Sequence, residues 1–180
     1  MNLIKNLRRF VRENKGVAAL EFAIIAPLLM VPLLLGSVDL IDVMGANKRA
    51  QNAAASLADV VARDTEISNA ELTSLWRGLD VLMYPNLSGA MEIRISSISI
   101  VNASTARVVW SEGHGGMSGR TVNSNVSLDS RMMVVGSSVI MVESIYKYDA
   151  PLGFLFQNQV RMSHTAYRRS RLVDPIPRVA

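Results

Sequence analysis

The longest apolar stretch of the chain runs from Val17 to Val38, and Glu21 is its only charged residue. A helix of this length rises about 33 Å, which matches the roughly 30 Å hydrocarbon core of a bilayer. Apolar side chains surround such a helix on all sides, so it would have no polar face to turn toward water. The pattern predicts a membrane-spanning helix, with bounds of 17–44, because a chain of 180 residues has little room to bury it.

Residues 45–84 are predicted to form two further helical segments. In the first, small and apolar residues recur at spacings of three and four, at Ala50, Ala53, Ala54, Leu57, Ala58, Val60 and Val61. One continuous rod from Val17 to Arg63 is therefore expected, with Gly45 as a candidate kink. Its small-residue stripe fits packing against the core or against a partner equally well. The second helix begins at the capping box Ser68-x-x-Glu71, and Pro85 ends it.

After Pro85 the apolar residues no longer recur at spacings of three and four but alternate with polar ones. Residues 85–170 are therefore predicted to be rich in β-structure. Strands are expected at 91–102, at 105–112, within 131–150 and at 159–170, with a Gly/Ser/Asn-rich loop at 113–130. A phase change at Ser96-Ser97 predicts a bulge. Residues 171–180 are expected to form an irregular tail, because Pro175 and Pro177 cannot donate to a sheet. The predicted fold class is α+β: a long helix, a second helix and an antiparallel sheet of about four strands.

The net charge of +4 is confined to one end of the chain. Residues 1–16 contain five basic residues and one acidic residue, and the rest of the chain contains 14 of each. A nucleic-acid-binding domain would be expected to carry excess positive charge on its folded body, so no nucleic-acid partner is expected. By the positive-inside rule, residues 1–16 are predicted to be a leader that lies in the cytoplasm, and the C-terminal domain is predicted to lie outside it. The absence of cysteine excludes disulfides and thiolate metal sites.

The features within the apolar run admit alternatives. A removable secretory signal would have a shorter apolar region, of about 7–15 residues, followed by a small-residue cleavage site that is not evident here. Pro27 and Pro32 interrupt the backbone hydrogen bonds of a helix and are predicted to be kinks. Glu21 either reaches the headgroups from the cytoplasmic end of the span or pairs with a specific cation.

The segment Gly16-Val17-Ala18-Ala19-Leu20-Glu21-Phe22 follows the basic leader. It resembles the processing signature of type IV prepilins and pseudopilins. Residues 16–40, the following NKRAQNAAASLADVVARD and the later RMSHTAYRRSRL are similar to TadE/TadF/TadG-type proteins of the Tad (Flp) pilus system. The resemblance implies that a prepilin peptidase cuts after Gly16 and that Glu21 sets the register between neighbouring subunits. Cleavage would give Val17 an α-amino group that is mostly cationic at neutral pH, and Glu21 offers this group a carboxylate.

Motifs for catalysis are not evident in the sequence. His114 lies in the Gly-rich loop and His164 in a predicted strand, without the spacing of a metalloprotease, nucleophile-elbow or Walker motif. Glu112 and His114 are fewer ligands than a metal site needs. We therefore expect no enzymatic activity, metal, cofactor or small-molecule substrate. The cluster Arg168, Arg169 and Arg171 is expected to be a solvated face.

These expectations combine into one functional hypothesis and one alternative. The hypothesis is a non-catalytic minor pilin or pseudopilin of the bacterial inner membrane, which crosses it once and takes part in Tad pilus assembly or secretion. Its expected partners are the prepilin peptidase, other Tad pilins and platform proteins, which it contacts through residues 17–63. The alternative is an uncleaved bitopic protein with an extracytoplasmic ligand-binding or sensor domain, in which Glu21→Ala would have little effect on assembly.

Overall fold

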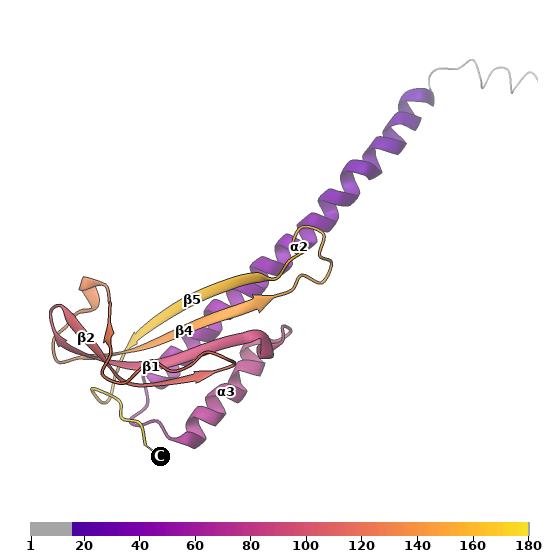
Figure 1. The fold of residues 1–180 in the computed structure, drawn as a ribbon. Helices are drawn as coiled ribbons and strands as arrows, with labels where there is room; N and C mark the ends of the chain where they lie inside the picture. The colour runs from indigo at the N-terminus through magenta and orange to yellow at the C-terminus, as the bar shows by residue number, and fades with distance from the viewer. Residues whose placement is uncertain (1–15, 180) are drawn as a thin grey trace, which may run out of the picture.

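The computed structural model describes residues 16–179 and has the predicted α+β architecture (Figure 1). The predicted leader lies outside the described residues, apart from Gly16. The elements, in chain order, are α2 (Val17–Val61), α3 (Asn69–Met83), the 3-10 turn η2 (Ser88–Ala90), β1 (Met91–Asn102), β2 (Thr105–His114), β3 (Asn125–Val126), the 3-10 turn η3 (Ser130–Met132), β4 (Ser138–Tyr148) and β5 (Val160–Arg169).

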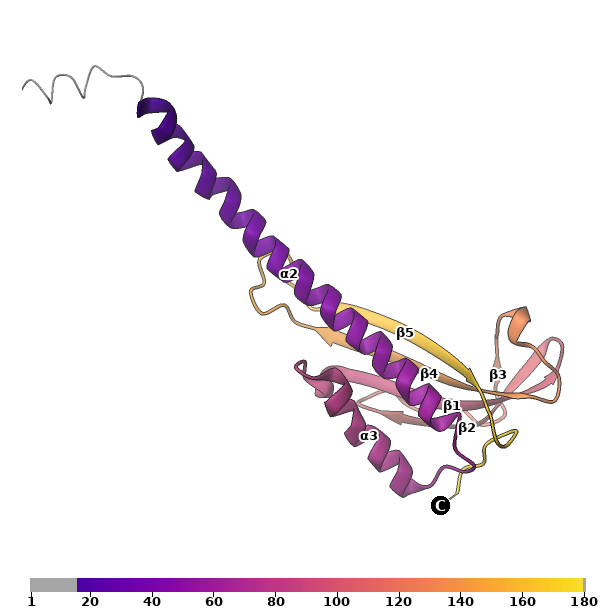
Figure 2. The same ribbon diagram turned by 180° about the vertical axis from the view of Figure 1, so that it is seen from behind.

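Helix α2 is one uninterrupted rod of 45 residues, about 68 Å long. Its N-terminal half projects away from the domain, and its C-terminal half lies along the sheet (Figure 2). The predicted continuity through Gly45 is confirmed, and the helix does not end there. The residues that α2 buries are spaced by three and four from Gly36 onward: Gly36, Asp39, Val43, Ala46, Ala50, Ala53, Ala54, Leu57, Ala58 and Val61.

The sheet has five antiparallel strands in the order β3-β2-β1-β4-β5, one more than predicted. The additional strand β3 has only two residues, too few to leave an alternating pattern in the sequence. The predicted irregularity at Ser97 is confirmed as a register shift between β1 and β2. The register places the extra residue, Val109, on β2, while β1 keeps an unbroken register with β4.

Two hydrophobic clusters form on the two faces of the sheet. The larger cluster contains the buried residues of α2 and α3 together with Ile93 and Ile95 of β1. The smaller cluster contains Ile98 and Ile100 of the same strand. The phase change in the β1 sequence therefore marks the point where its large residues move from the helix-covered face to the opposite face.

The alanine stripe of α2 packs against its own domain, which decides between the two predicted roles for it. Ala46, Ala50, Ala53, Ala54 and Ala58 have no exposed surface, and this part of α2 lies against β4 and β5. Methyl side chains let the helix approach the sheet closely, and larger ones would hold the two apart.

Helix α3 begins as predicted and covers a second part of the core. Ser68 and Glu71 form both hydrogen bonds of a capping box, with Glu71 Oε2 accepting from the Ser68 backbone N–H at 2.6 Å. Leu72, Leu79 and Met83 are buried beneath it.

The tail is irregular as predicted, yet the domain holds it firmly. Ile176 is fully buried, and its carbonyl accepts a hydrogen bond of 2.8 Å from Trp110 Nε1. Ile67, in the α2–α3 connection, forms a parallel bridge with Arg178. The C-terminal segment is thus part of the core rather than a loose end.

Candidate functional site

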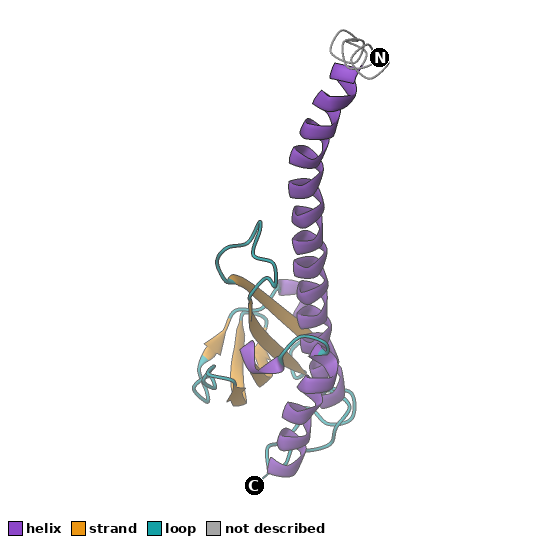
Figure 3. Ribbon diagram, turned by 90° about the vertical axis from the view of Figure 1, so that its right-hand side faces the viewer, coloured by secondary structure: helices purple, strands orange, loops and turns teal. Residues whose placement is uncertain are grey.

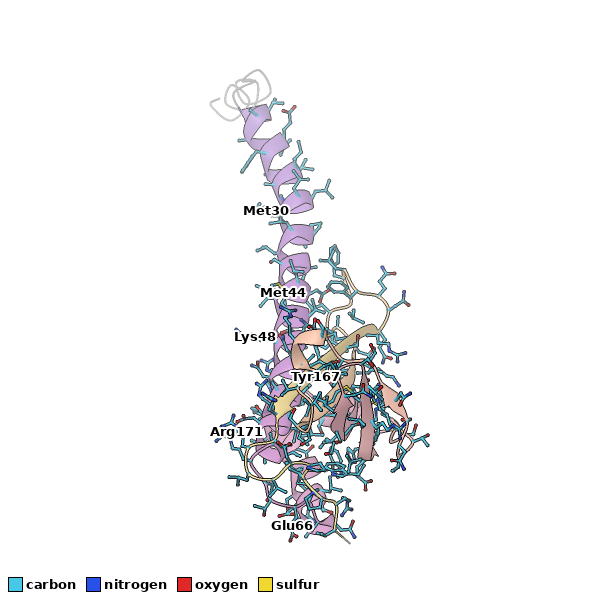
Figure 4. The ribbon with its side chains drawn as sticks, turned by 90° about the vertical axis from the view of Figure 1, so that its left-hand side faces the viewer. Met30, Met44, Lys48, Glu66, Tyr167 and Arg171 are labelled. Carbon is cyan, nitrogen blue, oxygen red and sulfur yellow. The ribbon has the colours of Figure 1, made fainter. Side chains whose placement is uncertain are left out.

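The projecting half of α2 has an apolar surface that the rest of the described chain leaves uncovered over most of its length before Gly36. Its large hydrophobic residues from Val17 to Leu34 are 48% to 73% exposed. None of its most apolar 18-residue stretch is buried in the domain. Side chains extend on every side of this half, and Figure 4 marks Met30 within it. A core helix of a water-soluble protein would be covered, so this half is suited to cross a membrane.

The predicted processing residues lie at the tip of this rod. Gly16 is the N-cap of α2, with φ −87° and ψ −14°, and a Cβ added to it would meet no atom within 4 Å. Val17 begins the helix, and Glu21 is exposed one turn further on. One helical turn places residues i and i+4 on the same side of a helix, so Val17 and Glu21 share a face. The fold itself has no need for glycine at position 16.

Pro27 and Pro32 both lie inside α2, and helical structure continues on either side of each. A proline has no N–H to give to the carbonyl four residues before it, which leaves the carbonyls of Ala23 and Leu28 without their usual donors. Kinks at Pro27 and Pro32 stay a prediction.

The projecting half of α2 joins the domain at Asp39. The Asp39 side chain is fully buried. Its Oδ2 accepts the backbone N–H groups of Phe154 at 2.7 Å and Leu155 at 2.8 Å. Leu155 also covers Gly36, where an added Cβ would lie 3.2 Å from Leu155 Cδ1. Asp39 thus fastens the β4–β5 connection to α2 at the end of its exposed half.

The spacing of α2 contains a signal for this contact. Gly36, Asp39, Val43 and Ala46 follow the same three-and-four spacing as the buried residues beyond them. An acid in register with a buried stripe indicates a carboxylate with specific donors, since a buried charge needs partners.

The predicted solvated face of Arg168, Arg169 and Arg171 is confirmed, since all three are exposed, and two of them also pair with α2. Asp59 Oδ1 lies 2.6 Å from Arg171 Nη2 and 3.7 Å from Arg168 Nε, and Arg63 pairs with the same carboxylate. Arg169 instead donates to Ser137 Oγ at 3.0 Å. The sequence did not predict these pairs, because Asp59 lies more than a hundred residues before the arginines. Figure 4 shows Arg171 beside the C-terminal half of α2.

The two residues considered as metal ligands have other contacts. Glu112 Oε1 accepts from Arg178 Nε at 3.1 Å. His114 stacks on Trp76, with ring centroids 4.9 Å apart and ring planes 7° from parallel. Residues 16–179 contain no group of three or more His, Asp or Glu side chains placed to hold a metal ion.

The Gly-rich loop after β2 is packed closely against neighbouring backbone. A Cβ on Gly113 would lie 1.8 Å from the Met117 carbonyl oxygen, and Gly115 has φ +69° with the Met91 carbonyl oxygen 2.2 Å from its added Cβ. These glycines serve the fold and form no phosphate cradle.

Comparison with known families concerns the same helix. Residues 16–59 match the family model described as TadE-like protein. No curated protein and no solved structure shows a significant match to the chain. The matched segment begins at Gly16 and covers the projecting half of α2 and most of the half that packs on the sheet. Residues 16–59 are therefore similar to TadE-like proteins, in agreement with the resemblance seen in the sequence.

Proposed function

We propose that this protein is a non-catalytic, minor pilin-like subunit of a Tad (Flp) pilus assembly or secretion system that crosses the bacterial inner membrane once. One observation carries the proposal. The segment that matches the TadE-like family includes an apolar helix half that its own domain leaves uncovered. In water such a surface would be costly, whereas lipid or the apolar helices of other subunits would cover it.

The leader supports an orientation with the N-terminus in the cytoplasm and the domain in the periplasm. All of the net positive charge precedes Val17, and Asp39 and Asp42 follow the exposed apolar stretch. Cytoplasmic flanks of membrane helices are enriched in lysine and arginine, which gives this orientation.

Processing after Gly16 is supported by the lack of any structural need for that glycine. Substitution at Gly16 would meet no neighbouring atom in the described chain. A residue without a side chain at the junction of leader and helix can change its backbone conformation easily, which suits the active site of a peptidase. Cleavage would remove the basic leader and leave Val17 with a new amine.

Glu21 is proposed to pair with the amine of Val17 of a neighbouring subunit. The carboxylate lies on the exposed rod. A carboxylate without a cationic partner is costly in lipid, so pairing selects the neighbour whose amine lies at the correct depth. The partners proposed are other Tad pilins and platform proteins.

The structure narrows the surface proposed for these partners. The alanine stripe from Ala46 to Ala58 is buried in the domain and is closed to a second helix. Contacts between subunits are therefore assigned to the exposed residues within 17–41, which leaves out the buried Gly36 and Asp39, rather than to all of residues 17–63.

The matched variants Glu21→Gln and Glu66→Gln test the proposal. Both remove one negative charge, and Glu66 is exposed in the α2–α3 connection, at the opposite end of the molecule from the projecting half of α2 (Figure 4). Affinity-tagged full-length chains would be isolated from membranes of a host with a complete Tad system, and pili on the cell surface would be counted. We expect Glu21→Gln to reduce both the amount of co-isolated pilus proteins and the number of surface pili by at least tenfold. Glu66→Gln should give the same amounts as the parent. Equal assembly by both variants would contradict the proposal and favour the bitopic alternative.

A further inference from the structure

We propose that the β4–β5 connection, residues 149–159, is a second membrane contact that enters the interfacial layer of the bilayer beside α2. The inference rests on the proposed membrane span and adds a lipid-binding surface on the folded domain. It commits to the bilayer as the occupant because the loop adjoins the exposed apolar surface of α2.

The depth of the loop follows from the length of the helix. Twenty helical residues from Val17 reach Gly36 and span about 30 Å, the thickness of the hydrocarbon core. Leu155 packs on Gly36, at the level where the hydrocarbon ends. Figure 3 shows this connection rising from the sheet alongside α2 in the direction of the N-terminus.

The chemistry of the loop suits that depth. Asp149, next to the end of β4, is the only charged residue of the loop, and residues 150–159 contain none. Leu152, Phe154 and Leu155 are 52%, 42% and 52% exposed, although they lie at one tip of a folded domain. Large apolar side chains at the membrane boundary are buried by the headgroup and acyl layer, as on interfacial membrane proteins.

Asp39 makes the loop compatible with this environment. Backbone N–H groups without a partner are costly at the edge of the hydrocarbon core, because hydrocarbon offers no acceptor. Asp39 Oδ2 accepts two such groups, those of Phe154 and Leu155. The Asp39 carboxylate is itself buried by this contact, so neither its charge nor these two donors face lipid.

Site-directed spin labelling tests the inference, since the chain has no cysteine to remove. Single cysteines would be introduced as Leu152→Cys in the loop, Leu28→Cys in the span and Val135→Cys in the exposed η3–β4 turn. Val135 lies at the opposite end of β4 from the loop, and 11 strand residues separate them by about 35 Å. Full-length chains would be reconstituted in vesicles of phosphatidylethanolamine and phosphatidylglycerol. Accessibility would then be measured to oxygen, which enters lipid, and to a water-soluble nickel chelate.

We expect labels at positions 28 and 152 to favour oxygen over the nickel chelate by at least threefold relative to the label at 135. If the label at position 28 favours oxygen but the label at 152 has the same accessibility ratio as the label at 135, the loop inference is overturned and the membrane span stands. If 28 also behaves like 135, the span fails and the loop inference fails with it. Protection of 152 from both reagents would mean that protein covers the loop, which also overturns a lipid contact.

Asp39→Ala and Asp42→Ala supply a second test of the positioning role of Asp39. Both substitutions remove one carboxylate from the same stretch of α2, but Asp42 is exposed and Asp39 holds the loop. We expect Asp39→Ala to raise the accessibility of the label at 152 to the nickel chelate, relative to oxygen, by at least twofold. Asp42→Ala should leave this ratio unchanged. An unchanged label in both variants would overturn the role given to Asp39.

Discussion

Glu143 on β4 lies directly opposite Arg94 on β1, and its Oε2 accepts a hydrogen bond of 2.6 Å from Arg94 Nη2. Arg120, from the long loop after β2, adds a second bridge of 2.8 Å from its Nη2 to Glu143 Oε1. One carboxylate therefore joins two strands and a loop. All three side chains are less than a third exposed, which makes this pairing stronger than an isolated surface ion pair.

Replacement of Glu143 by glutamine is predicted to lower the free energy of unfolding by about 1–3 kcal/mol, because both arginines lose a charged acceptor in a partly buried position. The measurement is urea unfolding of the full-length chain in detergent, followed by the fluorescence of Trp76 and Trp110. Glu66→Gln removes the same charge from an exposed position and is expected to change the value by less than 0.5 kcal/mol. Equal values for the two variants would show that the bridges contribute nothing.

Acid is predicted to weaken the domain through the same residue. Burial raises the pKa of Glu143, but hydrogen bonds from Arg120 and Arg94 outweigh this effect and hold the pKa below its ordinary value. The folded chain therefore binds fewer protons there than the unfolded chain, and stability rises with pH. The contribution of Glu143 is fully present above the ordinary pKa of about 4.5 and is lost as pH falls through the lower folded value.

Unfolding measured between pH 7 and pH 3 checks this prediction. The parent should lose more stability over that range than Glu143→Gln, which has no proton to bind at this position. Identical slopes for the two proteins would show that another group governs the acid response.

The tail is predicted to depend on Trp110. Trp110→Phe keeps the buried ring but removes the N–H that donates to the Ile176 carbonyl at 2.8 Å. A buried carbonyl left without its donor costs about 1–3 kcal/mol, so stability should fall by that amount. Hydrogen exchange should also become faster at residues 176–179. Trp76→Phe is the matched control, because Trp76 is only partly buried and lies on α3; faster exchange of the tail in both variants would contradict this role for Trp110.

Close packing of α2 on the sheet predicts a strong effect of size at Ala53. This residue has no exposed surface, and Ala53→Leu should destabilise the domain by about 1–3 kcal/mol, because the sheet would have to move. Ala55→Leu is the control, since Ala55 borders an open surface groove and has room for a larger side chain. A smaller loss of stability from Ala53→Leu than from Ala55→Leu would show that α2 does not pack closely on the sheet through its alanines.

Local patterns in the sequence are sufficient to predict most of this fold. The apolar run, the capping box at Ser68 and the alternation in β1 each depend only on residues that are neighbours in the sequence. The structure has all three features. The two-residue strand β3 was missed because pairing with β2, rather than its own sequence, makes it a strand.

The contacts that sequence could not supply join residues far apart in the chain. Asp39 binds backbone N–H groups that any residue type would offer, so the identities of Phe154 and Leu155 do not reveal the pairing. Asp59 gathers arginines from β5 and the tail in the same way. The candidate processing residues have the opposite character, because Gly16 and Glu21 were predicted from a local motif and the folded domain gives neither of them a structural role.

The mature N-terminus of the chain is the most direct test of the proposed function. Intact-mass measurement would compare protein from hosts with and without the prepilin peptidase. The parent is compared with Gly16→Val and with Gly89→Val, where an added Cβ likewise meets no atom within 4 Å. We predict that the parent and Gly89→Val begin at Val17 only when the peptidase is present, and that Gly16→Val keeps residues 1–16 in both hosts. A parent chain that keeps residues 1–16 in a host with active peptidase would contradict the proposal that cleavage creates the amine paired with Glu21.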